Sequence, residues 1–183
     1  MTSPATSPAP DLRFPIGRLQ RATTLAPDAR RAAIDAIAAA PSQLRKAVAG
    51  LTDAQLDTPY RPDGWTVRQL VHHVADSHMH ASARTRYALA EPGTTVTAYD
   101  EKKWAELADM RAEPVESSLA VLDGLHARWV RLLRAAKPED FARTIVHPEN
   151  GEMTLDGILS VYSWHGRHHT AHVTGLRDRM GWG

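Results

Sequence analysis

The chain has 183 residues, a length typical of one domain and sufficient to bury a sizeable hydrophobic core. Lys plus Arg is 22 and Asp plus Glu is 21, so the formal net charge of +1 gives no electrostatic case for nucleic acid or an anionic membrane as partner. The sequence has no cysteine, which excludes disulfides, thiolate zinc sites and a cysteine nucleophile.

The first 13 residues are rich in Pro, Ser, Thr and Ala and lack the basic start and apolar stretch of a signal peptide, so we expect a disordered tail over residues 1–13. The longest apolar runs fall far short of the roughly 20 residues that a membrane span needs. The absence of cysteine fits a reducing compartment. We therefore expect a cytoplasmic protein with a single domain over residues 14–183.

Apolar residues at helical spacing predict four long helices. The first begins at Asp28, and Pro41 within it predicts a kinked helix or two abutting ones. The second follows a capping box formed by Thr66 and Gln69 and reaches about Ala90.

The third predicted helix begins near Pro114 and reaches about Ala136, and the fourth runs from a cap at Thr154 to about Arg179. Residues 93–113 form a long irregular connection between the second and third helices, apart from a short turn that Asp100 can cap.

Shorter elements separate these helices. We expect an extended arm at residues 14–17, a helical turn after Thr52, a loop over residues 57–64 and a small hairpin or irregular turn over residues 144–154. Four amphipathic helices without a convincing sheet predict an all-α protein, a four-helix bundle.

Four of the ten histidines lie within residues 164–172. His165 and His169 are four apart, and two imidazoles at this spacing on one helix face can grip one divalent cation. On a helical wheel both face the apolar stripe, whereas His168 and His172 lie further round, so we expect that second pair on a solvated face. The alternative is that the inward histidines are hydrogen-bonded core residues without a metal.

A third ligand would come from the second helix, which holds four histidines within residues 71–80. Periodicity favours His78, one turn beyond Val74 on the apolar stripe, whereas His73 lies on the flank of the stripe and His72 faces away. The wheel alone does not choose between His73 and His78.

Many separate motifs along the chain agree in type and spacing with one family. They are Phe14-Pro-Ile-Gly17, Leu56-Asp-Thr-Pro-Tyr-Arg61, Gly64-Trp-Thr-Val-Arg-Gln69, His72-His73, Ala75-Asp-Ser-His-Met79, Tyr99-Asp-Glu-Lys102, Leu125-His126, Arg128-Trp129, His147-Pro-Glu149, Trp164-His165 and Arg179-Met-Gly-Trp182. Through them the chain resembles the YfiT group of the DinB superfamily over about residues 14–183.

This resemblance implies a four-helix bundle, often a homodimer, with a three-histidine site for a divalent metal ion, Zn²⁺ or Ni²⁺. The ligands that it implies are His73, His165 and His169. The helical wheel agrees for the last two, and for the first the resemblance overrules the periodicity that leaned toward His78.

Three imidazoles leave a coordination position open, which is typical of a catalytic rather than a structural site. The metal can activate a bound water, which gives the hydrolase activity usually attributed to this family, or a bound thiolate, which gives a thiol S-transferase. Relatives in the superfamily use low-molecular-weight thiols such as bacillithiol or mycothiol, so the expected substrate is a small molecule. The alternatives are a non-catalytic metal-binding stress-response bundle and a helical interaction module whose histidines are core residues.

Gly166 stands where zinc proteases of the His-Glu-x-x-His type carry their general base, which tips the reading slightly away from hydrolysis. The roles of five further polar residues stay open. His78, His126 and His147 can support the ligands or contact substrate, and Asp76 and Glu152 can act as bases or lie on the surface: the sequence does not decide.

Overall fold

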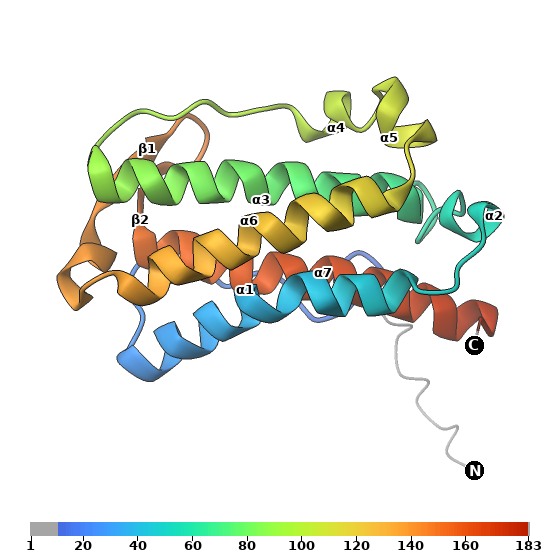
Figure 1. Cartoon of the computed structure of the whole chain (residues 1–183), viewed down its shortest axis with the longest axis horizontal. Coiled ribbons are helices and arrows are strands. Elements are labelled where there is room, and N and C mark those ends of the chain that lie inside the picture. Colours follow the sequence, from blue (N-terminus) through green and yellow to red (C-terminus); the bar gives the residue numbers. More distant parts are fainter. Residues whose placement is uncertain (1–10, 183) are drawn as a thin grey trace, which may run out of the picture.

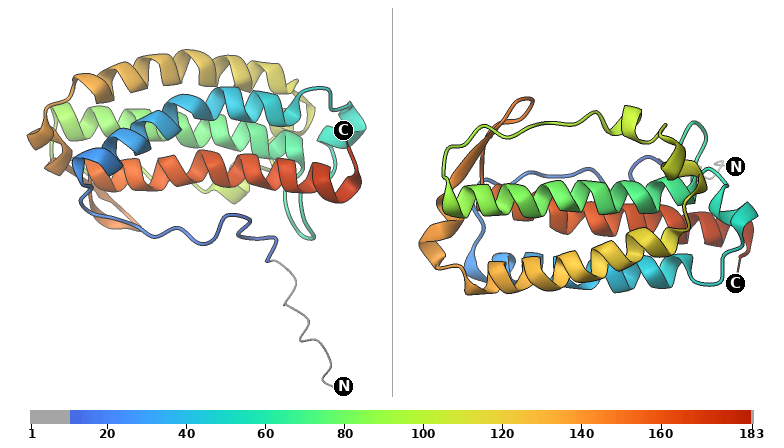
Figure 2. Two further views of the ribbon diagram at one scale, coloured as in Figure 1. Left: turned by 90° about the horizontal axis from the view of Figure 1, so that it is seen from below. Right: turned by 45° about the horizontal axis from the view of Figure 1, so that its top comes forward.

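The computed structural model describes residues 11–182, and four long helices lying side by side dominate it (Figures 1 and 2). They are α1 (Pro27–Val48), α3 (Val67–Ala90), α6 (Val115–Ala135) and α7 (Leu155–Met180). The predicted all-α four-helix bundle is confirmed, with helix boundaries close to those expected.

The helices are not joined in simple up-down-up-down order. Both α1 and α3 pack against α6 and α7, so α1 and α3 lie on opposite sides of the bundle although they are consecutive among the long helices. Helices α1 and α7 run in one direction and α3 and α6 in the other (Figure 1). The bundle therefore contains two pairs of adjacent parallel helices, an arrangement that the long connection between α3 and α6 permits.

Helix α1 continues through Pro41, so the alternative of two abutting helices is wrong. A proline inside a helix has no N–H for the carbonyl oxygen four residues earlier, here that of Ile37. This oxygen finds another donor, because Nδ1 of His126 lies 2.7 Å from it. A side chain of α6 thus satisfies the carbonyl that Pro41 leaves free.

The connection between α3 and α6 passes over the outer side of α3 and contains two short helices, α4 (Glu101–Trp104) and α5 (Ala108–Ala112) (Figure 1). Asp100 caps α4, as expected, by accepting hydrogen bonds from the N–H groups of the second and third helical residues. The connection is tied down at its start as well, since the N–H of Val96 donates to the carbonyl oxygen of Val146 at 2.9 Å.

Val146 belongs to a two-stranded antiparallel hairpin, β1 (Thr144–His147) and β2 (Gly151–Thr154), which confirms the expected hairpin. A 3-10 helix, η1 (Pro138–Ala142), leads into it from α6. Short helix α2 (Asp53–Leu56) and helix α3 both begin with the predicted capping boxes, and Thr154 caps α7.

The segment before α1 runs along α7. The N–H of Ala22 donates to Oγ of Ser160, and the N–H of Leu25 donates to Asp156. Of the expected tail, residues 1–10 lie outside the described residues, and residues 11–13 belong to a turn. The expected extended arm at residues 14–17 is also a turn, closed by a hydrogen bond of 2.9 Å from Gly17 N–H to Phe14 O, with Gly17 at a φ of 80°.

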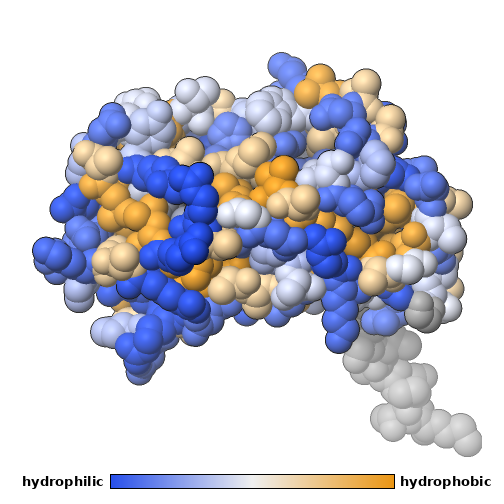
Figure 3. Space-filling view, viewed as in Figure 1, coloured by the Kyte–Doolittle hydropathy of each residue, from blue (hydrophilic) through white to orange (hydrophobic). Residues whose placement is uncertain are grey.

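The buried apolar side chains form two clusters, one at each end of the bundle. In α3 and α6 the residues that lie in sequence between the two clusters include buried histidines, His78 and His126, both at most 2% exposed. A layer of imidazoles therefore crosses the bundle at mid-height. On the outer face seen in Figure 3 the apolar side chains form separate patches divided by hydrophilic ones. No helix of residues 11–182 is long and apolar enough to cross a bilayer.

Candidate metal centre

Three imidazoles from two helices meet at the middle of the bundle. His73 projects from α3, and His165 and His169 project from α7 one turn apart, each offering one ring nitrogen within 4.8 Å of the others. Nε2 of His73 lies 3.3 Å from Nε2 of His165, and the ring centroid of His169 lies 5.0 Å from that of His73. The structure thus brings together the three residues that the sequence analysis selected. His78 is not one of them.

Burial keeps these three rings neutral. It lowers the pKa of His73 to about 4, and it also lowers the pKa of His165 and His169, whose neighbouring imidazoles add to the effect. A neutral imidazole has a lone pair free for a metal ion, whereas a protonated ring has none. Three neutral nitrogen donors at this spacing fit a divalent ion of the zinc or nickel type.

A chain of hydrogen bonds fixes which nitrogen of His165 carries the proton. The carbonyl oxygen of Ile37 can only accept, so Nδ1 of His126, 2.7 Å away, carries a proton. In a neutral His126 the other nitrogen, Nε2, then accepts a hydrogen bond of 2.8 Å from Nδ1 of His78.

The series of hydrogen bonds continues from His78 to His165 with the same donor and acceptor order. His78 donates through Nδ1, so its Nε2 accepts from Nδ1 of His165, 3.1 Å away. Because Nδ1 of His165 carries the proton, the lone pair of this ring is on Nε2, the atom that faces His73. His78 and His126 therefore support the ring of His165 and do not join the three converging imidazoles. Sequence periodicity placed His78 on the apolar stripe of its helix and left the role of His126 open, and it gave no sign of this link or of its anchor at Pro41.

Packing, and not catalytic chemistry, explains why a glycine stands at position 166. A Cβ atom at this position would lie 2.9 Å from Cβ of Ala40 and 3.6 Å from Cε1 of His78. The position faces α1 and the imidazole layer, where a glutamate side chain has no room. A general base of the His-Glu-x-x-His type is therefore incompatible with the packing of this bundle.

The three imidazoles line a cleft of about 350 Å³. Its other walls include Tyr99 from the long connection, His147 from β1, and Arg84 and Tyr162 from the bundle. The sequence analysis missed Arg84, although a signal was present. It lies three residues after Ala81 and four before Ala88, both buried, so a charge falls on the buried stripe of α3.

His168 and His172 do not lie on a solvated face, so that prediction is wrong. They are 7% and 4% exposed, because Trp164 stacks on the first ring and Tyr60 packs against the second. Burial lowers their pKa values to about 4 and about 3. With His169 they form a second group of three imidazoles at metal-binding distance, which shares His169 with the first group.

The two candidate carboxylate bases lie away from the cleft. Asp76 is half-buried on α3, and burial, with a contribution from Asp109, raises its pKa to about 6. Glu152 is exposed on β2 opposite Val146. Neither lines the cleft beside the three imidazoles.

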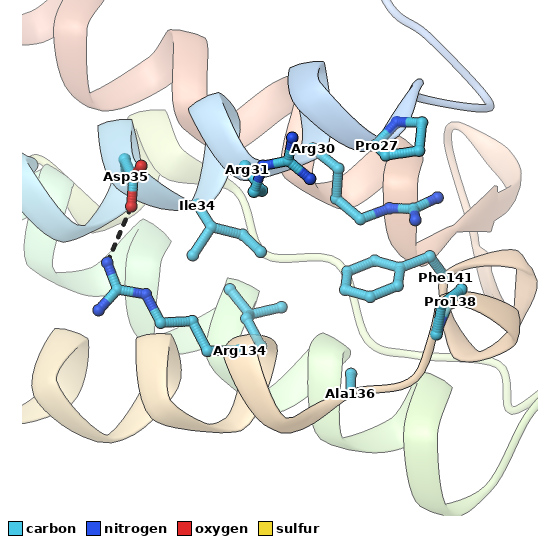
Figure 4. A pocket seen from close by; sticks show the side chains of 10 residues that line it. Pro27, Arg30, Arg31, Ile34, Asp35, Arg134, Ala136, Pro138 and Phe141 are labelled. Atoms are coloured by element: carbon cyan, nitrogen blue, oxygen red, sulfur yellow. Dashed lines mark hydrogen bonds and ion pairs between the residues drawn. The ribbon is translucent and has the colours of Figure 1, made fainter.

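Another hollow, of about 450 Å³, lies between α1, α6 and η1 (Figure 4). Arg134 and Asp35 form an ion pair at its edge, and Arg30 lies over the ring of Phe141 while pairing with Asp156. Each of its charged side chains already forms an ion pair, and none of its lining residues belongs to a group of metal-binding side chains among residues 11–182. The cleft at the three imidazoles is the better candidate for chemistry.

Comparison with known proteins finds relatives that match nearly the whole chain. A model of the DinB superfamily matches residues 36–173. Proteins of Bacillus mycoides (strain KBAB4) and Bacillus cereus (strain B4264), both named "Putative metal-dependent hydrolase", are 48% and 49% identical over 172 residues, which are 94% of this chain and 99% of each relative.

Solved structures agree. YfiT from Bacillus subtilis, described as "a probable metal-dependent hydrolase with an unusual four-helix bundle topology", is 43% identical, with a TM-score of 0.91 over 94% of this chain and 99% of that one. TT2238, a four-helix bundle protein 22% identical, shares the fold with a TM-score of 0.54 over 83% of this chain and 98% of that one. The chain therefore belongs to the DinB superfamily, and to the part of it that contains YfiT.

Proposed function

We propose that this protein is a metal-dependent enzyme whose ion, Zn²⁺ or Ni²⁺, is held by His73, His165 and His169. The observation that carries the proposal is the convergence of three buried, neutral imidazoles on one cleft. A divalent ion at this place would supply Lewis-acid chemistry and would lower the pKa of a water or a thiol that enters the cleft. The names of the relatives, metal-dependent hydrolases, support the coarse assignment.

The chain's own residues prepare this site in three ways. Burial keeps the imidazoles neutral, the hydrogen-bond chain from Ile37 directs the lone pair of His165 inward, and Trp65 packs against the ring of His73 at 4.7 Å between centroids. Second partners of this kind fix the tautomer and orientation of a metal-binding histidine. They support a site that is already arranged before the ion binds.

Between the two reactions, the geometry favours transfer of a low-molecular-weight thiol, of the bacillithiol type, to an electrophile. Hydrolysis by an activated water usually uses a general base beside the metal. The position that would carry it, Gly166, has no room for a carboxylate, and the cleft's own carboxylates, Glu101 and Glu149, are exposed. A thiol needs no such base once its pKa is lowered. Hydrolysis of a small substrate remains the second candidate.

Metal content and turnover test the proposal in two steps. Protein purified without an affinity tag should contain about one divalent ion per chain, and His165→Ala should lose it. An equal metal content in the wild type and in His165→Ala would refute the site. The metal-loaded protein should then conjugate bacillithiol to monochlorobimane faster than the buffer control. Metal binding without conjugation, but with ester cleavage, would select the hydrolase, and binding without either reaction would select the non-catalytic stress-response bundle.

Two further expectations accompany the proposal. We infer that the protein is a homodimer, from the family resemblance, and that it works in the cytoplasm, from the absence of cysteine. Light scattering during size-exclusion chromatography tests the first, and fractionation of cells of the source organism tests the second.

A further inference from the structure

Arg84 is a buried cation on the wall of the cleft. Its side chain belongs to α3 and the residue is only 9% exposed. Among residues 11–182 no carboxylate lies within salt-bridge distance of its guanidinium, although the chain's other well-buried arginine, Arg68, contacts two carboxylates. A buried charge without a counter-charge is costly and is rarely kept without a use.

The hydrogen bonds of Arg84 leave part of its donor capacity free. Nη1 donates to the hydroxyl of Tyr162 at 3.1 Å, and Nη2 donates to the carbonyl oxygen of Thr97 at 3.4 Å. Nε is buried and has no partner. Both partners are neutral, so they hold the guanidinium in place without neutralising it.

A second donor lies on the same wall. Nδ1 of His147 accepts a hydrogen bond of 3.2 Å from the backbone N–H of Glu149, and the amide nitrogen of Asn150 lies at the same distance. Because a backbone N–H can only donate, Nδ1 of His147 carries the lone pair and Nε2 carries the proton. No residue of the described chain accepts a hydrogen bond from this Nε2–H, and His147 lines the cleft.

Both donors line the same cleft as the three imidazoles. The hydroxyl of Tyr162 contacts Arg84, and the ring of Tyr162 lies 5.7 Å, centroid to centroid, from that of His165. A small molecule can therefore reach the three imidazoles and the guanidinium together.

The charge of the cleft selects among anions. Its other charged side chains, Glu101 and Glu149, are acidic and exposed. The charge of a divalent ion at the three imidazoles would be met by a bound thiolate and the two exposed carboxylates, so the guanidinium balances one further negative charge, which a dianion such as a phosphate monoester would exceed. The planar guanidinium also matches a carboxylate geometrically.

We propose that Arg84 and His147 bind a carboxylate group of the substrate while its reacting atom lies at the three imidazoles. This inference rests on the proposed function and narrows it: the electrophile that the thiol attacks, the thiol itself, or the ester or amide cleaved instead carries a carboxylate near its reacting atom.

Binding of ω-mercaptocarboxylates to the Co²⁺-loaded protein tests the proposal. Acids with two to five carbon atoms are compared with their uncharged amides of equal length, and the near-ultraviolet sulfur-to-cobalt absorption gives each dissociation constant. For at least one chain length the acid should bind about tenfold more tightly than the amide, as expected for one charged hydrogen-bonded pair. Arg84→Met should abolish this preference, His147→Phe should reduce it, and Arg86→Met, which removes an exposed arginine of the same helix, should leave it unchanged.

Acid-to-amide ratios within about twofold at every chain length, or a ratio that survives in Arg84→Met, would overturn the carboxylate site. A second measurement does not need the metal: the ¹⁵N-¹H resonance of Arg84 Nε in the metal-free protein should shift with butyrate and not with butyramide. A shift with both compounds or with neither contradicts the proposal even if Arg84→Met fails to fold. Failure of Co²⁺ to bind, together with a butyrate-specific shift, would refute the metal centre and leave the carboxylate site standing.

Discussion

Nδ1 of His126 donates a hydrogen bond of 2.7 Å to the carbonyl oxygen of Ile37, the oxygen that Pro41 leaves without a helical donor. This contact orients every later hydrogen bond in the chain from His126 through His78 to His165. A proline in one helix therefore determines which nitrogen a histidine of another helix presents to the candidate metal centre.

Breaking this chain at its anchor should weaken metal binding. His126→Leu removes both the acceptor for His78 and the donor to Ile37, so His165 loses its fixed tautomer. Loss of a direct partner of a metal-binding histidine typically costs 10–100-fold in affinity, and because His126 acts on His165 through His78 we expect a decrease at the lower end, about tenfold. Competition with a chromophoric chelator measures it.

Two further variants separate this effect from a general loss of stability. His126→Gln keeps one donor and one acceptor and should retain most of the affinity. Thr85→Val removes a buried hydrogen bond between the same two helices, the one of 2.9 Å from Trp129 Nε1, and should lower stability without changing metal affinity. Equal metal affinities for His126→Leu and the wild type would show that the hydrogen bonds from Ile37 through His126 and His78 do not set the tautomer of His165.

Gly166→Ala should destabilise the fold, because the new methyl group would lie 2.9 Å from Cβ of Ala40. Overpacking of this kind costs about 1–3 kcal/mol. Urea unfolding of the metal-free protein measures it. Gly124→Ala in α6 is the matched control, since nothing lies within 4 Å of a Cβ at that position, and it should be neutral or stabilising by up to about 1 kcal/mol.

The double variant Gly166→Ala with Ala40→Gly removes the methyl group that the new one meets. The double variant should be more stable than the sum of the two single substitutions predicts, by a coupling energy of about 1 kcal/mol or more. Additive effects of the two substitutions would locate the strain elsewhere.

The four long helices and the pair of histidines on α7 can be predicted from the sequence, because both depend on residues close together in the chain. Capping residues and apolar periodicity define the long helices, and the spacing of His165 and His169 holds in any α-helix. Relations between elements are different. His73 and His78 both contact His165, and only the position of α7 decides that His73, and not His78, lies at metal-binding distance from both His165 and His169.

The burial of His168 and His172 likewise depends on distant segments. The loop that carries Tyr60 covers one ring, and Phe14, in the segment before α1, lies near the other with 6.4 Å between ring centroids. A helical wheel describes one helix alone, so it assigns such residues to solvent. The hydrogen bond to the carbonyl oxygen of Ile37 could not be predicted either. A proline in a sequence predicts that this oxygen loses its helical donor but not which side chain donates to it instead.

The burial of His172 predicts a loss of stability in acid. Its pKa is lowered by burial to about 3 in the folded protein, whereas that of an unfolded histidine is 6.5. Below pH 6.5 the unfolded chain therefore binds a proton that the folded protein does not, and stability falls by up to about 1.4 kcal/mol per pH unit for this group. Urea unfolding with chelator present, from pH 8 to 5, measures the decrease.

In His172→Phe the unfolding free energy should fall less steeply between pH 6 and pH 5, because the unfolded variant takes up about one proton fewer. Above pH 7 both states of His172 are neutral, so the difference in stability between the variant and the wild type should stay constant there. Parallel curves over the whole range would mean that His172 is protonated equally in the folded and unfolded states.

A buried carboxylate at the start of α7 holds the end of the segment before α1. Asp156 is 2% exposed, accepts a hydrogen bond of 2.9 Å from the N–H of Leu25 and pairs with Arg30 through two bonds of 2.8 Å. Asp156→Asn leaves Arg30 without its counter-charge, and breaking a buried pair in this way costs about 3–5 kcal/mol. Because the side chain of Arg30 is 16% exposed, water compensates part of the loss, so we expect a cost near the lower end of that range in urea unfolding.

Asp28→Asn is the matched control, since Asp28 and Arg31 form an exposed ion pair on the same helix α1. Exposed pairs contribute about 0–1 kcal/mol, so this variant should unfold close to the wild type. Hydrogen exchange gives the more specific result. Asp156→Asn should lose protection at the N–H groups of Leu25 and Ala22, the two backbone donors that tie the segment to α7, while the N–H groups at the centre of α3 stay protected. Equal protection at Leu25 in the variant and the wild type would mean that the segment is held by its other contacts with α7.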